Sequence, residues 1–502
     1  MNKFMNGLVD ATNFGYTENG AIKRNTTKSD LLDMFAMGGA MRQRSDADII
    51  LMFRKALAEN EVYALKCLFY LRDVRGGQGE RRFFRICMKD LAINNTEAAR
   101  RNMKHIAEFG RYDDLYTLVD TPLEMEMFAF IKEQLALDLE CETPSLLAKW
   151  LKSENTSSID SRKFGNKTRI ALGMSHRQYR KTLSYLRFKI NVLERLMSQN
   201  RWSEIEFDKI PSKAGLIYKN AFARHDVERA EAKAMTYAEF AKSKDTKVNA
   251  KTLNPVEIAN QIFHTWRPSE TERLMWDKYW EGLKDYYNGR EERGIAVVDV
   301  SGSMSGQPLN AAVSMGAYIA ERGRGPFANH FITFSGAPEL VKFEGVDIYD
   351  KFSRAARADW GMNTNIEATF DLLLDTAIKN HCTQSEIPET LYIFSDMEFD
   401  DCVTTSKVVR SVWSSSVEHL TLDKADTLFE ATAKKWAAHG YKLPRVIFWN
   451  LDCRHENIPA IGDGFSYVSG FSLACMESIL SGKDGYDLMM DVLNHEAYSV
   501  IQ

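Results

Sequence analysis

The segment "GIAVVDVSGSMSG", from Gly294 to Gly306, marks the point where the chain changes character. Its first half is a continuous apolar run, as a strand buried on both faces of a sheet requires. Asp299, Ser301 and Ser303 then follow within five residues. Hydroxyl and carboxylate groups spaced this closely suit a hard cation, an oxyanion or a simple turn, and the rest of the chain has to decide between these.

After this segment, short apolar runs alternate with segments of helical periodicity. Alternation of this kind predicts a doubly wound, mostly parallel α/β sheet with a Rossmann-like arrangement over residues 291–502. The shorter run at 339–345 is expected at a sheet edge. The predicted strands cover 294–300, 329–336, 339–345, 389–398, 444–451 and 464–470, and the predicted helices cover 307–323, 365–380, 426–440 and 471–482.

Before this segment the pattern is helical. From 46 to 290 the apolar residues recur at three- and four-residue spacing, with a break between two helices at Glu59–Asn60. Many helices joined by short turns indicate a helical-repeat (HEAT-like) array, so the fold class is α plus α/β multidomain. Residues 1–45 are expected to be irregular, apart from a short helical piece near "KSDLLDMFAMGGAM" at 28–41. The predicted domains are therefore 1–45, 46–290 and 291–502.

The charges are divided unevenly between these parts. Residues 291–502 carry 17 Lys and Arg against 30 Asp and Glu, whereas residues 1–290 carry 48 against 39. The basic part is suited to a polyanion and the acidic part to a cation or a basic partner. Seven scattered cysteines without zinc-type spacing indicate reduced thiols. With no signal peptide and no long apolar run, we expect a cytoplasmic protein with no membrane role.

The carboxyl ends of parallel strands are where ligands bind in such sheets. Asp299 and Asp396 each end a predicted strand, and Thr364 lies in the loop "WGMNTN" before a helix. These residues can therefore converge with Ser301 and Ser303 on a metal ion. Hydroxyl and carboxylate oxygens suit Mg²⁺ or another divalent cation, with one position left for a ligand.

At this point residues 294 to about 496 resemble a von Willebrand factor A domain. Its metal-ion-dependent adhesion site has the pattern Asp-x-Ser-x-Ser, then a later Thr, then a later Asp. "DVSGSM", "GMNTN" and "FSDME" match these three elements in order. Asn365 departs from the pattern, since many members have a second Thr there. The resemblance implies that the metal accepts a carboxylate from a protein ligand.

Enzymatic alternatives have less support in this sequence. No histidine base lies in these three loops, no second Asp follows Asp299 by two residues, and no nucleotide-binding P-loop occurs. A metal-dependent nuclease or phosphatase would need an acid cluster and a base near the metal, and neither is found. We therefore predict no catalytic residues and no enzymatic activity.

Residues 161–190 contain nine basic residues and no acidic residue, interleaved with Phe164, Tyr179, Tyr185 and Phe188. Such a segment either binds nucleic acid, by neutralising phosphates and stacking on bases, or is a solvated basic face over core aromatics. The candidate RNA contacts are Arg162, Lys163, Lys167, Arg169, Arg177, Arg180, Lys181, Arg187 and Lys189.

A second arginine-rich segment, "RDVRGGQGERRFFR", spans Arg72 to Arg85. Its glycines permit a tight turn and close backbone approach, and a plain interhelical turn with surface arginines is the simpler interpretation. Asp113 and Asp114, in "GRYDDL", are expected to be helix caps. The candidate RNA contacts in this segment are Arg72, Arg75, Arg81 and Arg82.

The order of helical repeats and an A domain resembles the Ro ribonucleoprotein (TROVE) family. It is most similar to relatives of that family in bacteria, phages, fungi and plants, through "LRDVRGGQGERRFF", "GRYDDL" and "LLAKWLKSEN". The resemblance covers about residues 30–496. It implies binding of small structured RNAs or of single-stranded RNA ends by residues 1–290.

Two functions follow from these observations. The first is a non-enzymatic RNA-binding protein of Ro-like architecture, with a metal-ion-dependent adhesion site. The alternative is a protein-interaction scaffold or phage assembly protein that binds an acidic partner group through the metal, without a nucleic-acid role. Pairing of the nine basic residues with acidic groups from other helices would favour the alternative.

Overall fold

The computed structural model describes residues 3–334, 338–356, 365–400 and 427–502. The chain divides into two compact units. The sheet unit comprises Met1–Glu61, Asn254–Trp266 and Asp285–Asn494, and the helical unit comprises Val62–Leu253, Arg267–Lys284 and His495–Gln502. The predicted boundaries at 45 and 290 therefore differ from the observed ones, because residues 1–61 and 254–266 pack with the sheet.

A six-stranded sheet forms the core of the sheet unit, in the order β5-β4-β3-β6-β7-β8. Every neighbouring pair is parallel except β4 and β5, which pair antiparallel at the edge. A mixed α/β unit with a mostly parallel sheet is thus confirmed, as is the edge position of the shorter strand. The strands are β3 (Gly294–Asp299), β4 (His330–Phe334), β5 (Glu339–Lys342), β6 (Thr390–Ser395), β7 (Arg445–Asn450) and β8 (Phe465–Ser469).

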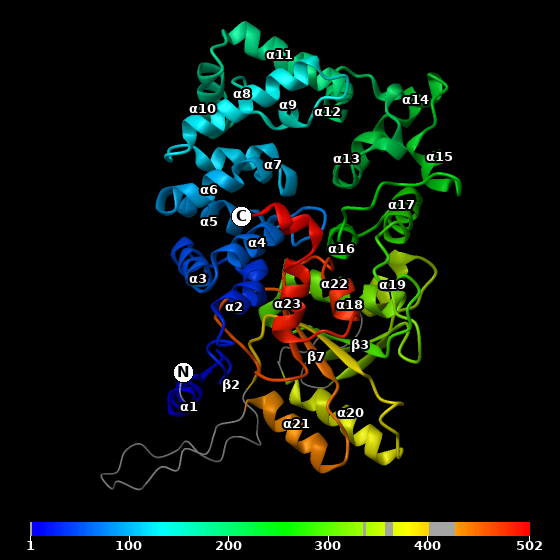
Figure 1. Cartoon of the computed structure of the whole chain (residues 1–502). Coiled ribbons are helices and arrows are strands. Elements are labelled where there is room, and N and C mark those ends of the chain that lie inside the picture. Colours follow the sequence, from blue (N-terminus) through cyan, green and yellow to red (C-terminus); the bar gives the residue numbers. More distant parts are fainter. Residues whose placement is uncertain (1–2, 335–337, 357–364, 401–426) are drawn as a thin grey trace. The chain divides into compact units, whose positions relative to one another are not determined.

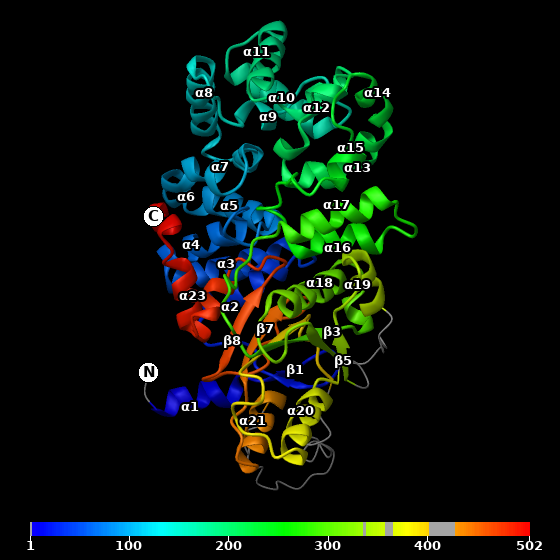
Figure 2. The same ribbon diagram turned by 90° about the vertical axis from the view of Figure 1, so that its right-hand side faces the viewer.

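Helices cover both faces of this sheet (Figures 1 and 2). On one face α18 (Gln307–Arg322) approaches β3 closely, since a Cβ on Gly316 would lie 2.5 Å from Cγ2 of Val298. On the other face Phe429 of α21 (Leu428–Ala438) packs edge-on against Phe448 of β7, with ring centroids 4.7 Å apart. The ladder aligns Val298 with Trp449, so Phe448 points to the opposite face.

Further helices complete the sheet unit. α16 (Pro255–Phe263) packs on α18, α20 contacts α21, and α2 and α23 contact β8. Their apolar sides are buried against the sheet, as amphipathic periodicity requires. These helices are α1 (Lys3–Thr12), α2 (Asp30–Met37), α3 (Asp46–Glu59), α19 (Ile348–Ala355), α20 (Glu367–Lys379), α22 (Met476–Leu480) and α23 (Gly485–Leu493).

The N-terminal segment is more ordered than predicted, although α2 lies within the short helical piece that was expected at 28–41. It contains α1, α2 and a small antiparallel pair, β1 (Gly15–Tyr16) and β2 (Ile22–Lys23). Ser469 at the end of β8 donates to the Phe35 carbonyl at 3.0 Å and accepts from the Gly39 amide at 2.9 Å. Leu31, Met34 and Phe35 are buried, so a long-range contact with β8 adds to the local capping of α2 by Ser29.

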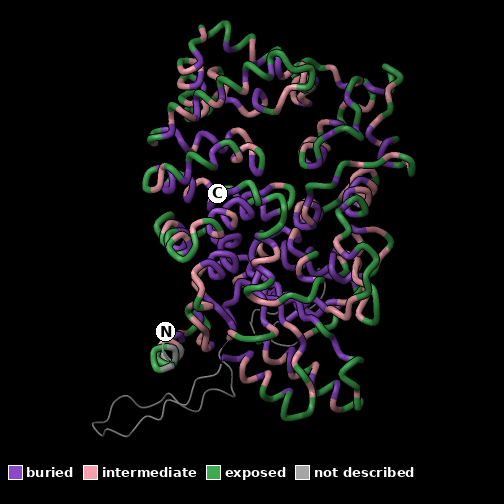
Figure 3. Tube along the Cα trace, viewed as in Figure 1, coloured by how far each residue is buried: buried purple, intermediate pink, exposed green. Residues whose placement is uncertain are grey.

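The helical unit contains no strand among the residues that the structure describes. Buried and exposed residues alternate along its helices, as the three- and four-residue spacing predicts (Figure 3). The predicted break at Glu59–Asn60 is confirmed, because α3 ends at Glu59 and α4 begins at Glu61. The helices are α4 (Glu61–Arg72), α5 (Arg81–Asn94), α6 (Thr96–Asn102), α7 (Ile106–Phe109), α8 (Glu124–Glu140), α9 (Leu147–Trp150), α10 (Ile159–Ala171), α11 (His176–Lys189), α12 (Leu193–Ser198), α13 (Ser212–Arg224), α14 (Asp226–Glu231), α15 (Tyr237–Lys242) and α17 (Glu270–Glu281).

Two other features of the described chain bear on the predictions. No helix in it combines the length and the apolar character that crossing a membrane requires. The six cysteines in it form no disulfide with one another, and Cys402 lies outside the described residues.

Candidate functional site

The carboxyl edge of the sheet holds the first group of predicted site residues. Strand order reverses between β3 and β6, since β3 leads to β4 on one side and β6 leads to β7 on the other. A crevice for ligands forms at such a switch point. Asp299 ends β3 and Asp396 directly follows β6, so the two carboxylates stand at this point. Both are buried.

Hydrogen bonds connect four of the five predicted metal ligands. The Oδ1 atom of Asp299 accepts from the Ser301 amide at 2.9 Å. The hydroxyls of Ser301 and Ser303 lie 3.0 Å apart, and Ser303 hydrogen-bonds Asp396. The structure thus brings Asp299, Ser301, Ser303 and Asp396 together, whereas Thr364 lies outside the described residues.

Two neighbours that the sequence did not reveal also bind this pair of carboxylates. The Ser395 hydroxyl donates to Oδ2 of Asp299 at 2.6 Å. Arg454, from the loop after β7, donates to Oδ2 of Asp396 at 2.6 Å. Ser395 was detectable as the residue directly before Asp396 in a predicted strand, but no local signal links Arg454 to Asp396.

The electrostatics of this edge favour a cation. Burial, together with the charge of Asp396, raises the pKa of Asp299 to about 7. Burial also raises the pKa of Asp396, although Ser303 and Arg454 act in the opposite direction. Two buried carboxylates with one guanidinium are short of positive charge. Their oxygens, with the two serine hydroxyls, fit the donor chemistry of Mg²⁺, so these four residues could hold it.

Beside this edge lies a smaller cluster that the sequence did not predict. Glu398 accepts from the Glu18 amide at 2.9 Å and lies 2.8 Å from Nδ1 of His455. Side-chain atoms of these three residues lie within 4.8 Å of one another, which is compatible with metal binding. Glu18 belongs to the N-terminal segment, so its nearness to Glu398 could not be anticipated from sequence spacing.

In the helical unit, residues 161–190 form a hairpin of α10 and α11. Five of its nine basic residues have partners. Lys167 lies 2.8 Å from Asp120, Lys163 lies 3.8 Å from the same carboxylate, and Arg169 lies 2.7 Å from Glu154. Arg187 donates to backbone carbonyls at the end of α9, and Lys189 donates to the Cys141 carbonyl. These five cations stabilise the hairpin.

The other four basic residues, namely Arg162, Arg177, Arg180 and Lys181, are exposed and have no side-chain partner among the described residues. In α11 the residues Arg177, Lys181, Tyr185 and Phe188 follow one another at spacings of four, four and three, which places them on one side of the helix. Tyr185 is 50% exposed and Phe188 is 53% exposed. The opposite side, with Tyr179, Leu183 and Leu186, is buried. We call this exposed row the α11 stripe.

The segment Arg72–Arg85 is organised differently, because its turn packs tightly against α4. A Cβ on Gly77 would lie 1.9 Å from the Tyr70 carbonyl oxygen, which confirms the predicted close backbone approach. Arg72 is 1% exposed and donates to Oδ2 of Asp114 at 2.6 and 2.9 Å. Burial therefore contradicts the prediction that Arg72 contacts RNA. Arg75 donates to the Glu108 carbonyl and is exposed.

Asp113 and Asp114 bind cations from three segments that are far apart in the sequence, namely 71–84, 110–115 and 146–155. These segments are the three motifs. Asp114 accepts from the Arg111 amide as a cap of the 3-10 helix η3 (Tyr112–Leu118), which confirms the expected capping role. Arg85 lies 2.7 Å from Asp114 and 3.2 Å from Asp113. Arg111 lies 2.9 Å from Asp113, and Lys152 lies 3.6 Å from it. We call Arg81, Arg85, Arg111, Lys152, Asp113 and Asp114 the motif cluster.

Arg81 and Arg82, the two remaining predictions, begin α5. Arg81 is exposed and forms no hydrogen bond or ion pair with a described residue, whereas Arg82 is partly buried. Arg111 and Lys152 were not predicted as binding residues. Lys152 follows Trp150 by two residues, but Arg111 lies far from both in the sequence and meets Trp150 only in the fold.

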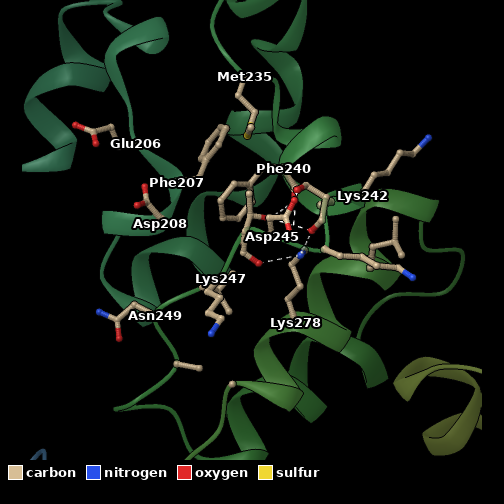
Figure 4. A pocket seen from close by; sticks show the side chains of 18 of the residues that line it. Glu206, Phe207, Asp208, Met235, Phe240, Lys242, Asp245, Lys247, Asn249 and Lys278 are labelled. Atoms are coloured by element: carbon tan, nitrogen blue, oxygen red, sulfur yellow. Dashed lines mark hydrogen bonds between the residues drawn. The ribbon is translucent and has the colours of Figure 1, made fainter.

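A further hollow in the helical unit lies between α15, α17 and residues 243–251 (Figure 4). Lys278 donates there to the carbonyls of Ser243 and Thr246, which fixes the 243–251 segment. Lys242, Lys247, Asp208 and Asp245 give its wall both signs of charge. The hollow therefore has no clear preference for an anion or a cation.

Comparison with known proteins adds the following. Residues 293–497 match the family described as "Domain of unknown function (DUF7788)". The chain is 29% identical over 513 residues to "Uncharacterized protein L728" of Acanthamoeba polyphaga mimivirus, with 94% of this chain and 85% of that protein covered. Residues 17–162 and 134–292, which together make up more than half of the chain, match a second family. The chain thus belongs to the family described as "Domain of unknown function (DUF2828)".

Proposed function

We propose that this protein is a non-enzymatic RNA-binding protein of Ro-like architecture. In this proposal the helical unit is a HEAT-like array that binds RNA, and the sheet unit is a von Willebrand A domain. The observation that carries the proposal is the α11 stripe, where unpaired cations and half-exposed aromatic rings share one side of a helix.

The chemistry of the α11 stripe suits a single strand of RNA. Arg177 and Lys181 can neutralise phosphates. Lys189 lies over the Tyr185 ring and Arg195 over the Phe188 ring, so a base would stack on the other face of each ring. The opposite side of α11 is buried, so the helix backbone under the stripe is fixed and only the side chains lose conformational freedom on binding. Arg162 and Arg180 add two further exposed cations to the same hairpin.

For the sheet unit we propose a divalent cation, Mg²⁺ in the first instance. Asp299, Ser301, Ser303 and Asp396 would hold it, with Thr364 as the predicted fifth ligand. The ion would accept a carboxylate from a protein partner, while Asp299 and Asp396 keep it in place. The shortage of positive charge around these two buried carboxylates supports the assignment.

A protein-interaction scaffold is the second candidate function. The specific observation in its favour is that three of the nine basic residues pair with carboxylates from other segments, as a plain structural role would require. Four unpaired cations on one hairpin favour RNA over this alternative.

The deciding experiment is binding of labelled single-stranded and hairpin RNA to the purified chain at several salt concentrations. A triple variant, Arg177→Glu, Arg180→Glu and Lys181→Glu, should bind more weakly. Its plot of log affinity against log salt should be flatter by roughly 2, about 0.7 for each lost phosphate contact on a single strand.

The matched control reverses three exposed cations of the same unit that have no partner among the described residues, namely Lys104, Lys132 and Arg267. This control carries the same change in net charge, so it should bind RNA nearly as the unaltered protein does. Equal weakening in both variants, or an unchanged slope in the first, would remove the α11 stripe from the proposed surface.

A separate experiment addresses the metal. Asp299→Ala should abolish Mg²⁺ binding, measured by calorimetry, and leave RNA affinity unchanged, because the two sites use different residues. Loss of both in a folded variant would contradict the proposal of separate sites.

A further inference from the structure

The motif cluster has more positive than negative charge. Arg72, Arg85, Arg111 and Lys152 all lie within 4 Å of Asp113 or Asp114, so four cations share two carboxylates. Arg81 begins the adjacent helix without an ion pair and is close enough to feel the charges of Arg85 and Arg111. The cluster itself therefore carries an excess of two positive charges, and the buried Arg72 beside it adds a third.

Most of the side chains that carry this excess positive charge are only partly exposed to solvent. The side chains of Arg85, Arg111 and Lys152 are between 22% and 34% exposed, and Asp113 is 7% exposed. Like charges at such a site repel more strongly than in bulk water, because the protein screens them less. Although the side chain of Arg81 is exposed, partial desolvation, with repulsion from Arg111 and Arg85, lowers its pKa, and Asp113 and Asp114 act in the opposite direction.

The cations are also held in fixed orientations. Asp113 accepts two parallel bonds from Arg111, at 2.9 and 3.0 Å, and the guanidinium of Arg111 lies 4.0 Å from the centroid of the Trp150 ring. Asp114 holds Arg85 at 2.7 Å. A guanidinium fixed in this manner presents its remaining N–H groups to a ligand at little entropic cost.

We propose that Arg81, Arg85, Arg111 and Lys152 form a binding site for a phosphate group. The shared chemistry is a tetrahedral oxyanion, which comes from a polynucleotide backbone or from a small phosphate ester. If the phosphate belongs to a polynucleotide backbone, the inference rests on the proposed RNA-binding function. If it belongs to a small phosphate ester, the inference is independent of that function. Arg72 takes no part in ligand contact, because it is buried and serves to hold Asp114.

A purely structural network is the competing explanation. If the cations served only to hold the three motifs together, Arg81 would have no role, because it forms no hydrogen bond or ion pair with a described residue. Arg81→Gln is therefore the informative variant, because it removes a proposed ligand contact without breaking an ion pair. Arg267→Gln, at another exposed and unpaired arginine of the same unit, is its matched control.

The experiment is a calorimetric titration of the full chain with inorganic phosphate, at constant ionic strength set by chloride. The unaltered protein and Arg267→Gln should bind phosphate equally, and Arg81→Gln should bind roughly tenfold more weakly, as loss of one charge-assisted hydrogen bond predicts. Failure of the unaltered protein to bind phosphate, or equal binding by Arg81→Gln, would overturn the proposal.

A second titration, with single-stranded RNA present, separates the two sources. Displacement of phosphate by RNA identifies a polynucleotide backbone as the ligand, and undisturbed phosphate binding identifies a small phosphate ester. If RNA does not bind at all while Arg81→Gln still weakens phosphate binding, the proposed RNA function fails and the phosphate site stands.

Discussion

The hairpin α10–α11 and the segment Arg72–Arg85 are both rich in basic residues, but the protein uses these cations differently. In the hairpin, four of the nine basic residues are exposed without a partner. In the segment, Arg72 is buried on Asp114, and Arg85 shares Asp113 and Asp114 with Arg111. The first region has several cations available for a ligand, whereas the second uses Arg72 and Arg85 to fix its turn to Asp113 and Asp114.

This difference shows that basic composition alone does not define a binding surface. What matters is whether another part of the chain supplies the counter-charge. A buried ion pair is costly to break because the remaining charge is left without a partner, whereas an exposed unpaired arginine contributes little to stability. Removing a partner of a buried cation in Arg72–Arg85 should therefore destabilise the fold strongly, whereas removing an exposed cation of the hairpin should change stability little.

The largest expected effect is that of Asp114→Ala. It leaves the buried guanidinium of Arg72 without its partner and removes the cap of η3, so the free energy of unfolding should fall by about 3–5 kcal/mol. Urea unfolding followed by circular dichroism measures this change. Arg180→Ala in the hairpin is the control and should unfold as the unaltered protein does. A loss of less than about 1 kcal/mol for Asp114→Ala would mean that the pair is not structural.

An intermediate effect is expected for Gly110→Ala. The added Cβ would lie 2.5 Å from Oδ2 of Asp114 and 2.9 Å from Nε of Arg72, so it would push the ion pair apart. Overpacking of this kind costs about 1–3 kcal/mol. The same unfolding measurement should show a smaller loss in the Asp114→Ala background, because the contact with Asp114 is then absent and only those with Arg72 and the Ile106 carbonyl remain.

Gly173→Ala, in the turn of the hairpin, is the matched glycine control. Its φ is +67° and no atom lies within 4 Å of the added Cβ, so the cost comes from backbone strain alone, about 1 kcal/mol. The stability losses of Gly173→Ala and Asp114→Ala should therefore add in the double variant. If the losses of Gly110→Ala and Asp114→Ala also added, the contact of the new Cβ with the Arg72–Asp114 pair would be unimportant.

Much of the sheet unit could be predicted from the sequence. Buried parallel strands are short apolar runs, and their carboxyl ends share one edge, so Asp299 and Asp396 could be placed together without knowing the fold in detail. The place of the N-terminal segment could not be predicted. Its apolar residues pack against β8, more than 400 residues away in the chain, and no local pattern reports such a partner.

The partners of the basic residues were also beyond local reasoning. The segment 161–190 contains no acidic residue, but Asp120 and Glu154 lie outside it and neutralise Lys167 and Arg169 after folding. Conversely, Arg111 and Lys152 looked like ordinary surface residues, because the sequence does not show that both meet at Asp113. Only the three-dimensional contact separates structural cations from free ones.

The smallest expected effect concerns the response to acid and is tested with Asp113→Asn. Burial by itself would raise the pKa of Asp113, but Arg111, Arg85 and Lys152 outweigh it, so the pKa lies below its usual value. A carboxyl with a lowered pKa stabilises the fold above its unfolded pKa, near 3.9, and this stabilisation is lost as the pH falls through the folded pKa.

Asp113→Asn should therefore be less stable than the unaltered protein at pH 7, on the order of 1 kcal/mol for the lost charged hydrogen bonds. This difference should shrink as the pH falls below about 4, since the unaltered carboxyl then becomes neutral as well. Urea unfolding of both proteins at pH 7 and pH 3 measures it, and the other carboxyls cancel in the comparison. Arg180→Gln should show no such pH dependence. A stability difference between the two proteins that stays constant from pH 7 to pH 3 would mean that Asp113 acts through its shape and not through its charge. The cations of the motif cluster would then contribute as little to stability as the exposed cations of the hairpin.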